Sequence, residues 1–151
     1  MFTINTNLIF LDIDGVLITG SSGNLTTSHG VMSYMEPSCL KALSKVLRCQ
    51  AKPKIVISSS WRISMSNTEI AFADNNASDI WSLVVGKTGD FMTTRSNEIR
   101  EYLDNNDYLD YVIIDDHDMT SSFGPRMFVT EFKIGLTDKI ADDIIGYFGG
   151  K

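Results

Sequence analysis

The sequence predicts an α/β fold: a single doubly wound, mostly parallel sheet with helices on both faces. Short apolar runs typical of buried strands alternate along the chain with stretches of helical periodicity. The runs at 8–11 and 111–114 are each followed at once by a pair of acidic residues. Loops beyond the carboxyl ends of parallel strands are where open α/β sheets place their functional side chains.

The strands and helices are expected to follow one another in turn. Gly, Ser and Thr dominate the segment after the first strand, and Pro37 is a typical first residue of a helix. In order, we expect a strand at 8–11, a flap or hairpin at 16–35, a helix from Pro37 with a core-facing stripe of Leu40, Leu43, Val46 and Leu47, a strand at 54–58, a helix at 67–74, a strand at 83–85, a helix at 97–105 with Ser96 or Asn97 as N-cap, strands at 111–115 and 127–130, and a helix capped by Thr137 with Ile140, Ala141, Ile144 and Ile145 inward.

The first acidic pair comes directly after the strand at 8–11. Strand side chains alternate between faces, so Asp12 and Asp14 project the same way while Ile13 points into the core. Gly15 then allows the chain to turn sharply. Neighbouring carboxylates repel and need a shared proton or a cation, and Mg²⁺ prefers such ligands. The competing interpretation is a turn with solvated aspartates.

The second acidic pair, Asp115 and Asp116, follows the β-branched run at 111–114. If this strand and the first are parallel neighbours, their carboxylates converge on one edge of the sheet. That convergence favours a metal site over a solvated turn.

The strand at 54–57 ends in a different kind of sequence, Ser58-Ser59-Ser60-Trp61-Arg62. Hydroxyls and a guanidinium suit phosphate oxygens rather than a metal. Arg62 either grips phosphate or forms a salt bridge with Glu69 or an aspartate. Trp61 either stacks on a nucleobase or packs at the rim of the core.

These motifs together resemble the haloacid dehalogenase (HAD) superfamily of phosphohydrolases. The matching elements are LIFLDIDGVL, IVISSSWR and YVIIDD, and the resemblance spans roughly residues 8–147. The spelling SSSWR, then VGKT, then Arg95-x-x-Glu98 resembles a narrower branch, the HAD domains of RNA-repair proteins and polynucleotide-end phosphatases. The resemblance implies a Rossmann-like, HAD-like fold, and the gaps between motifs leave no room for a sizeable cap domain.

The resemblance also implies roles for the acids. Asp12 would be the nucleophile that forms an aspartyl-phosphate, and Asp14 would be the general acid and then the base. Mg²⁺ would be held by Asp12, the backbone carbonyl of Asp14, and Asp115. Asp116 would complete this metal site by orienting its ligands from behind.

In this interpretation, the remaining site residues bind the phosphate group of the substrate. Ser58 would hydrogen-bond the transferring phosphoryl group, and Ser59 would replace it if the strand ends one residue later. Arg62 and Gly15 are further phosphate-binding candidates. The basic residue of the third motif is either Arg95 or Lys87; the spacing ahead of Asp115 favours Arg95, although the family more often uses lysine.

Composition places few limits on this picture. The chain has 151 residues, 43% apolar and 21% charged, with a formal net charge of -6. We expect one domain over residues 1–151, without a membrane span or signal peptide, with Cys39 and Cys49 reduced and a cytoplasmic location. A basic stripe that would hold long nucleic acid is missing from the sequence.

The expected function is therefore that of a Mg²⁺-dependent phosphomonoesterase. A site without a cap is open to large substrates, which favours a phosphorylated nucleic-acid end or a nucleotide as partner. The alternatives are a phospho-receiver-like signalling domain and a catalytically inactive HAD-like interaction module. The oligomeric state is left open by the sequence.

Overall fold

The fold is described from a computed structural model, for residues 5–20, 24–27, 30–89 and 93–149. The strands are β1 Leu8–Leu11, β2 Asn24–Thr27, β3 Gly30–Ser33, β4 Lys54–Ile57, β5 Val84–Lys87, β6 Tyr111–Asp115 and β7 Met127–Val129. The helices are α1 Pro37–Leu47, α2 Met65–Asp74, α3 Ser78–Trp81, α4 Arg95–Asn105, α5 Thr120–Phe123 and α6 Asp138–Tyr147, with 3-10 turns η1 Ser60–Ile63 and η2 Gly124–Arg126.

Within these residues, a five-stranded sheet has the order β5-β4-β1-β6-β7. All of its strand pairs are parallel, and Leu11 of β1 lies opposite Ile57 of β4 and Ile114 of β6. The chain builds one side of the sheet from β1 through β4 to β5 and then crosses to β6. The strand order therefore reverses beside β1, and its carboxyl end is the switch point at which such folds bind ligands. The predicted α/β architecture is confirmed.

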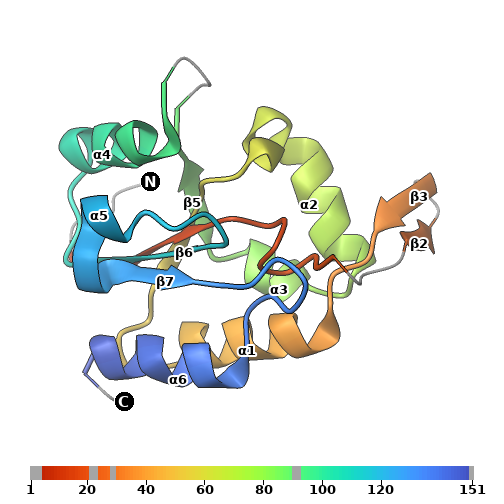
Figure 1. The fold of residues 1–151 in the computed structure, drawn as a ribbon. Coiled ribbons are helices and arrows are strands. Elements are labelled where there is room, and N and C mark those ends of the chain that lie inside the picture. Colours follow the sequence, from red (N-terminus) through yellow and green to blue (C-terminus); the bar gives the residue numbers. More distant parts are fainter. Residues whose placement is uncertain (1–4, 21–23, 28–29, 90–92, 150–151) are drawn as a thin grey trace.

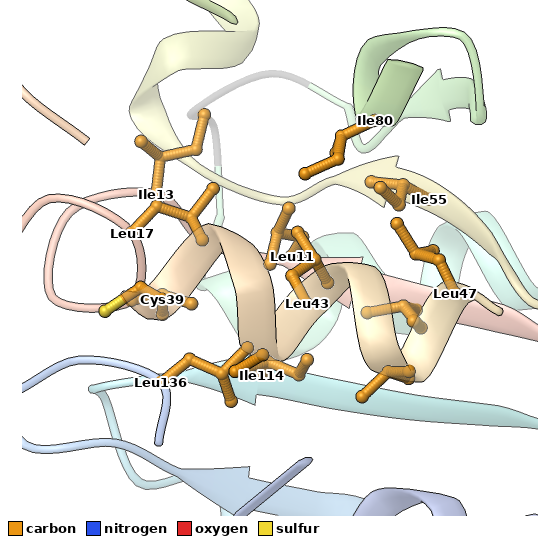
Figure 2. Close-up of a cluster of buried hydrophobic side chains, with 14 of the residues drawn as sticks. Leu11, Ile13, Leu17, Cys39, Leu43, Leu47, Ile55, Ile80, Ile114 and Leu136 are labelled. Atoms are coloured by element: carbon orange, nitrogen blue, oxygen red, sulfur yellow. The ribbon is translucent and has the colours of Figure 1, made fainter. Parts of the chain in front are cut away.

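Helices cover both faces of this sheet, because alternate side chains of each strand point to opposite sides. On one face, Ile9 and Leu11 join a cluster that includes Leu43 of α1 and Ile144 of α6. On the other face, Phe10 packs with residues of α4 and α5. Figure 1 shows α1 and α6 side by side below the sheet and α4 above it. In Figure 2, Leu43 of α1 points towards Leu11 of β1 within the larger cluster.

Several element boundaries differ from the sequence prediction. The short strand β5 extends to Lys87 instead of ending at 85, because it pairs with β4 up to Ile57. Helix α4 begins at Arg95, and its N-cap is Thr94 rather than Ser96 or Asn97: the Thr94 hydroxyl accepts a hydrogen bond from the Asn97 amide. The short helices α3 and α5 were not predicted, since a single turn carries no periodic signal.

The segment between β1 and α1 contains an antiparallel hairpin of β2 and β3. Figure 1 shows it projecting beside α2. No large cap is present among the described residues, as predicted. No helix in the described part of the chain combines the length and the apolar character that a bilayer crossing requires. Cys39 and Cys49 are both buried and unpaired.

Candidate functional site

The carboxylates of Asp12, Asp115 and Asp116 gather at the switch point of the sheet. The Asp12 amide donates to the carbonyl of Ile114 at 3.0 Å, which places Asp12 beside the last residue of β6, Asp115. One oxygen from each of the three carboxylates lies within 4.8 Å of the other two. The convergence expected from the sequence is met in part: Asp12 joins Asp115 and Asp116 because β1 and β6 are parallel neighbours in register, whereas the carboxylate of Asp14 does not join them.

Asp12 is almost completely withdrawn from solvent, with 4% of its surface exposed. Its Oδ1 accepts a hydrogen bond from the amide of Ile13 at 2.9 Å, which fixes the carboxylate at the strand end. Burial, together with the negative charge of Asp115, raises the pKa of Asp12 to about 8, and Arg95 opposes this shift. Burial also raises the pKa of Asp115. Both acids therefore favour a proton or a cation over two bare charges.

Arg95 is the cation that the structure brings to these acids. Its Nη1 lies 2.9 and 2.8 Å from the two oxygens of Asp115 and 3.5 Å from Oδ2 of Asp12. It is the first residue of α4, so the Thr94 cap that starts this helix also positions the guanidinium. Lys87, the other candidate, is exposed on β5 and donates to the carbonyl of Arg62 at 3.4 Å. The geometry therefore places Arg95, not Lys87, at the carboxylates.

Gly15, in the loop after β1, lies directly against the side chain of Asp116, which follows β6. It has a φ of +83°, and a Cβ built on it would come within 2.5 Å of Oδ2 of Asp116. Only glycine accepts both the left-handed backbone and this close approach. The loop is tied to the neighbouring strand end, since the Thr130 hydroxyl donates to the Gly15 carbonyl at 2.6 Å. The turn expected at Gly15 is present. A side chain added at Gly15 would first meet the carboxylate of Asp116.

Ser58 and Ser59 differ in what their hydroxyls do. The Ser58 amide donates to the carbonyl of Leu11 at 2.9 Å, so Ser58 follows β4 beside the end of β1. Its Oγ is buried and has no hydrogen-bond partner among the described residues. Ser59 Oγ instead accepts from the amide of Trp61 at 3.3 Å and caps the η1 turn. A buried hydroxyl without a partner is costly, so of the two serines Ser58 is the one whose hydroxyl still has a hydrogen bond to make.

The structure corrects the prediction for Arg62. Its side chain is buried, and Nη2 contacts the two oxygens of Glu98 at 3.0 and 2.9 Å. Nη1 donates to the carbonyl of Ser59 at 3.0 Å, and Nε donates to that of Gly89. The guanidinium is thus engaged in holding η1 against α4 instead of gripping phosphate, and its acidic partner is Glu98 rather than Glu69 or an aspartate.

Asp14 and Trp61 form a contact that the sequence did not suggest. Asp14 is exposed, and its Oδ2 accepts a hydrogen bond from the indole Nε1 of Trp61 at 3.2 Å. The Trp61 ring also packs at the edge of the larger hydrophobic cluster. The packing alternative for Trp61 is therefore the one seen, with a polar contact added to it.

The donor set suits a hard divalent cation. The three gathered groups offer carboxylate oxygens, the ligands that Mg²⁺ prefers, and contain no thiolate or imidazole. Burial that raises the pKa of Asp12 and Asp115 makes a compensating cation favourable at this position. Asp14 contributes no carboxylate to this group; its predicted contribution, a backbone carbonyl, stays a prediction.

Glu98, missed as a functional residue, is signalled by its spacing from Arg95. Residues three apart on a helix share a face, so both side chains of α4 reach the same edge of the sheet. Trp61 carries no comparable signal, because its partner Asp14 is 47 residues away in the chain.

A parallel α/β sheet with acids gathered at its switch point has the architecture of a HAD-like domain. The family of HAD domains in Swiss Army Knife RNA repair proteins matches residues 8–141 of the chain, which therefore belongs to this family. The resemblance carried by the sequence motifs is confirmed. No curated protein and no solved structure gave a significant match. Family membership supports a HAD-type phosphatase in general.

Proposed function

We propose that this protein is a Mg²⁺-dependent phosphomonoesterase that works through a phosphorylated Asp12. The observation that carries the proposal is the convergence of Asp12, Asp115 and Asp116 on one edge of the sheet, with Arg95 across them. Asp12, Asp115 and the backbone carbonyl of Asp14 would hold the ion, with Asp116 beside them. When bound, Mg²⁺ would supply positive charge that offsets the phosphoryl oxygens.

In the first step, a carboxylate oxygen of Asp12 attacks phosphorus, and the bond from phosphorus to the ester oxygen breaks. Asp14 donates its proton to that leaving oxygen, so an alcohol departs and Asp12 carries the phosphoryl group. Arg95 and the hydroxyl of Ser58 would hydrogen-bond the phosphoryl oxygens; the contact of Arg95 with Asp12 and the Ser58 Oγ, unpartnered among the described residues, support these roles.

In the second step, Asp14, now ionised, takes a proton from a water molecule as that water attacks phosphorus. The bond between Asp12 and phosphorus breaks, which releases inorganic phosphate and returns Asp12 to its carboxylate form. Splitting one displacement into two lowers the barrier to each. The amide of Ile13 keeps Asp12 in place throughout, because its hydrogen bond is to Oδ1 of that carboxylate.

We further propose a phosphorylated nucleic-acid end or a nucleotide as the substrate. The description of the matched family as domains of RNA repair proteins supports this class. The absence of a large cap among the described residues supports it as well, since an uncovered site admits the end of a polymer.

The test is release of inorganic phosphate from p-nitrophenyl phosphate, nucleotides, and oligonucleotides phosphorylated at the 3′ or 5′ end. Each is assayed with Mg²⁺ and with a chelator. Asp12→Asn should lower turnover by on the order of 10³-fold or more, because it removes the nucleophile. Asp104→Asn, which changes an exposed carboxylate on α4, is the matched control and should retain activity.

Oligonucleotide ends should be preferred to p-nitrophenyl phosphate. A preference for mononucleotides would keep the mechanism and select the nucleotide alternative. Full activity of Asp12→Asn would refute the covalent mechanism. Phosphorylation by acetyl phosphate without turnover would favour the signalling alternative, and no reaction at all would favour the interaction module.

A further inference from the structure

We infer that Trp61 is a positioning residue for the leaving-group acid: its indole N–H holds the carboxyl group of Asp14 in one orientation. This inference rests on the proposed function and adds to it a residue outside the acid cluster. The observation behind it is the hydrogen bond of 3.2 Å from Nε1 of Trp61 to Oδ2 of Asp14. No other hydrogen bond reaches that carboxylate within the described residues.

The indole group determines which atom donates and which atom accepts in this hydrogen bond. Indole N–H can only donate, so Oδ2 of Asp14 is the acceptor in this contact and the carboxyl group is held through that oxygen. The side chain of Asp14 is exposed and would otherwise rotate freely. Trp61 therefore fixes the orientation of the group.

Trp61 itself is held firmly enough to serve as a reference point. Its amide donates to the Ser59 hydroxyl at 3.3 Å, and its carbonyl accepts from the Thr68 hydroxyl at 2.8 Å. The next residue, Arg62, is anchored by the buried Glu98. Only the ring edge with Nε1 needs to face the loop after β1. An orienting contact on a rigid turn is the arrangement that general acid catalysis requires.

The test compares substrates that differ in their need for a proton on the leaving oxygen. Phenyl phosphate needs protonation, whereas 2,4-dinitrophenyl phosphate releases a stable anion without it. The measured quantity is kcat/KM, because it reports the steps up to cleavage of the ester bond. Trp61→Phe, which keeps the ring and removes the N–H, should lower kcat/KM about tenfold for phenyl phosphate and less than about twofold for 2,4-dinitrophenyl phosphate.

Two controls separate positioning from simple damage to the fold. Trp81→Phe makes the same exchange at another half-buried tryptophan, packed on Phe72, and should change both substrates equally little. In an Asp14→Ala background, Trp61→Phe should have no further effect, since the group it positions is gone. The 2,4-dinitrophenyl substrate serves as an internal measure of intact protein.

An equal loss on both substrates, or an undiminished loss in the Asp14→Ala background, would overturn the role of Trp61 and leave the proposed function intact. Wild-type protein that hydrolyses neither substrate nor any phosphorylated end would overturn the proposed function, and this inference with it.

Discussion

Arg62 and Glu98 form an ion pair that is almost inaccessible to water: 4% of each side chain is exposed. The pair joins η1, which follows β4, to α4, which precedes β6. Arg95, which contacts Asp12 and Asp115, lies one helical turn before Glu98 on the same helix. One helix thus fixes both the turn that carries Trp61 and the cation that faces the acids.

Breaking this pair on one side should destabilise the protein strongly. Arg62→Met leaves Glu98 buried without its cation and should lower the free energy of unfolding by about 3–5 kcal/mol. The double variant Arg62→Met/Glu98→Met should lose less than the sum of the single variants, because no charge is left unpaired. Urea unfolding measures all of these. Lys139→Met, which breaks the exposed pair with Asp143, should change stability by less than about 1 kcal/mol.

Gly15→Ala should weaken both the fold and the metal site. The new Cβ would meet Oδ2 of Asp116, and the backbone would stay in a left-handed conformation, at a cost of about 1–3 kcal/mol. Mg²⁺ affinity should fall as Asp116 is displaced, as measured by calorimetric titration. Gly146→Ala in α6, where a Cβ meets nothing within 4 Å, should instead raise stability by up to about 1 kcal/mol. Unchanged Mg²⁺ affinity in Gly15→Ala would exclude Asp116 from the metal site.

The two candidates for the third-motif base are separated by a pair of variants. Arg95→Ala removes the only cation seen at the gathered carboxylates among the described residues, and should lower kcat by about 10²-fold or more. Lys87→Ala removes an exposed side chain that contacts the Arg62 carbonyl, and should have a much smaller effect. Steady-state kinetics on one substrate decides between them, and the reverse order of effects would assign the role to Lys87.

Without metal, stability should fall as pH rises. Folding raises the pKa of Asp12 from 3.8 to about 8, so between these values the folded protein binds more protons than the unfolded chain. The stabilisation is complete below the lower value and is lost as pH rises through the higher one. Urea unfolding in a chelator across this range should show the decline. The Asp12→Asn variant cannot ionise at this position, so its stability should decline less steeply with pH. An equal slope in the two proteins would contradict the assignment of this pH dependence to Asp12.

Mg²⁺ should stabilise the folded protein through the acid cluster. At a concentration 100 times Kd, a ligand of the folded state adds about 2.7 kcal/mol to the free energy of unfolding. Asp115→Asn should abolish most of this gain, because it removes a buried ligand oxygen. Thermal unfolding with and without Mg²⁺ measures the effect, and Asp104→Asn serves as the control. An undiminished gain in Asp115→Asn would place the ion elsewhere.

The sheet and the meeting of the acids could be predicted because both depend on local signals. The strand β1 and residues 112–114 of β6 are apolar and buried, and parallel pairing alone brings Asp12 beside Asp115. Thr137 was likewise recognisable as a helix start, and its hydroxyl accepts from the Ile140 amide.

The partners of individual long side chains could not be predicted in the same way. Arg62 selects Glu98 over Glu69 because α4 is packed against η1, a relation that no local pattern contains. Lys87 and Arg95 both stayed candidates in the sequence, where spacing favoured Arg95, and the start of α4 at Arg95 after its Thr94 cap places Arg95 at the acids. The Trp61–Asp14 contact depends on the turn after β4 and the loop after β1 meeting in space.

The negative charge of the gathered carboxylates predicts the order in which Mg²⁺ and the phosphate ester bind. Among the described residues, Asp12, Asp115 and Asp116 gather around one cation, Arg95, so their ionised forms repel a phosphate dianion until a metal ion is present. The phosphate ester should therefore bind after Mg²⁺. Initial-rate kinetics should show compulsory addition of Mg²⁺ before substrate, with product phosphate leaving while the ion stays.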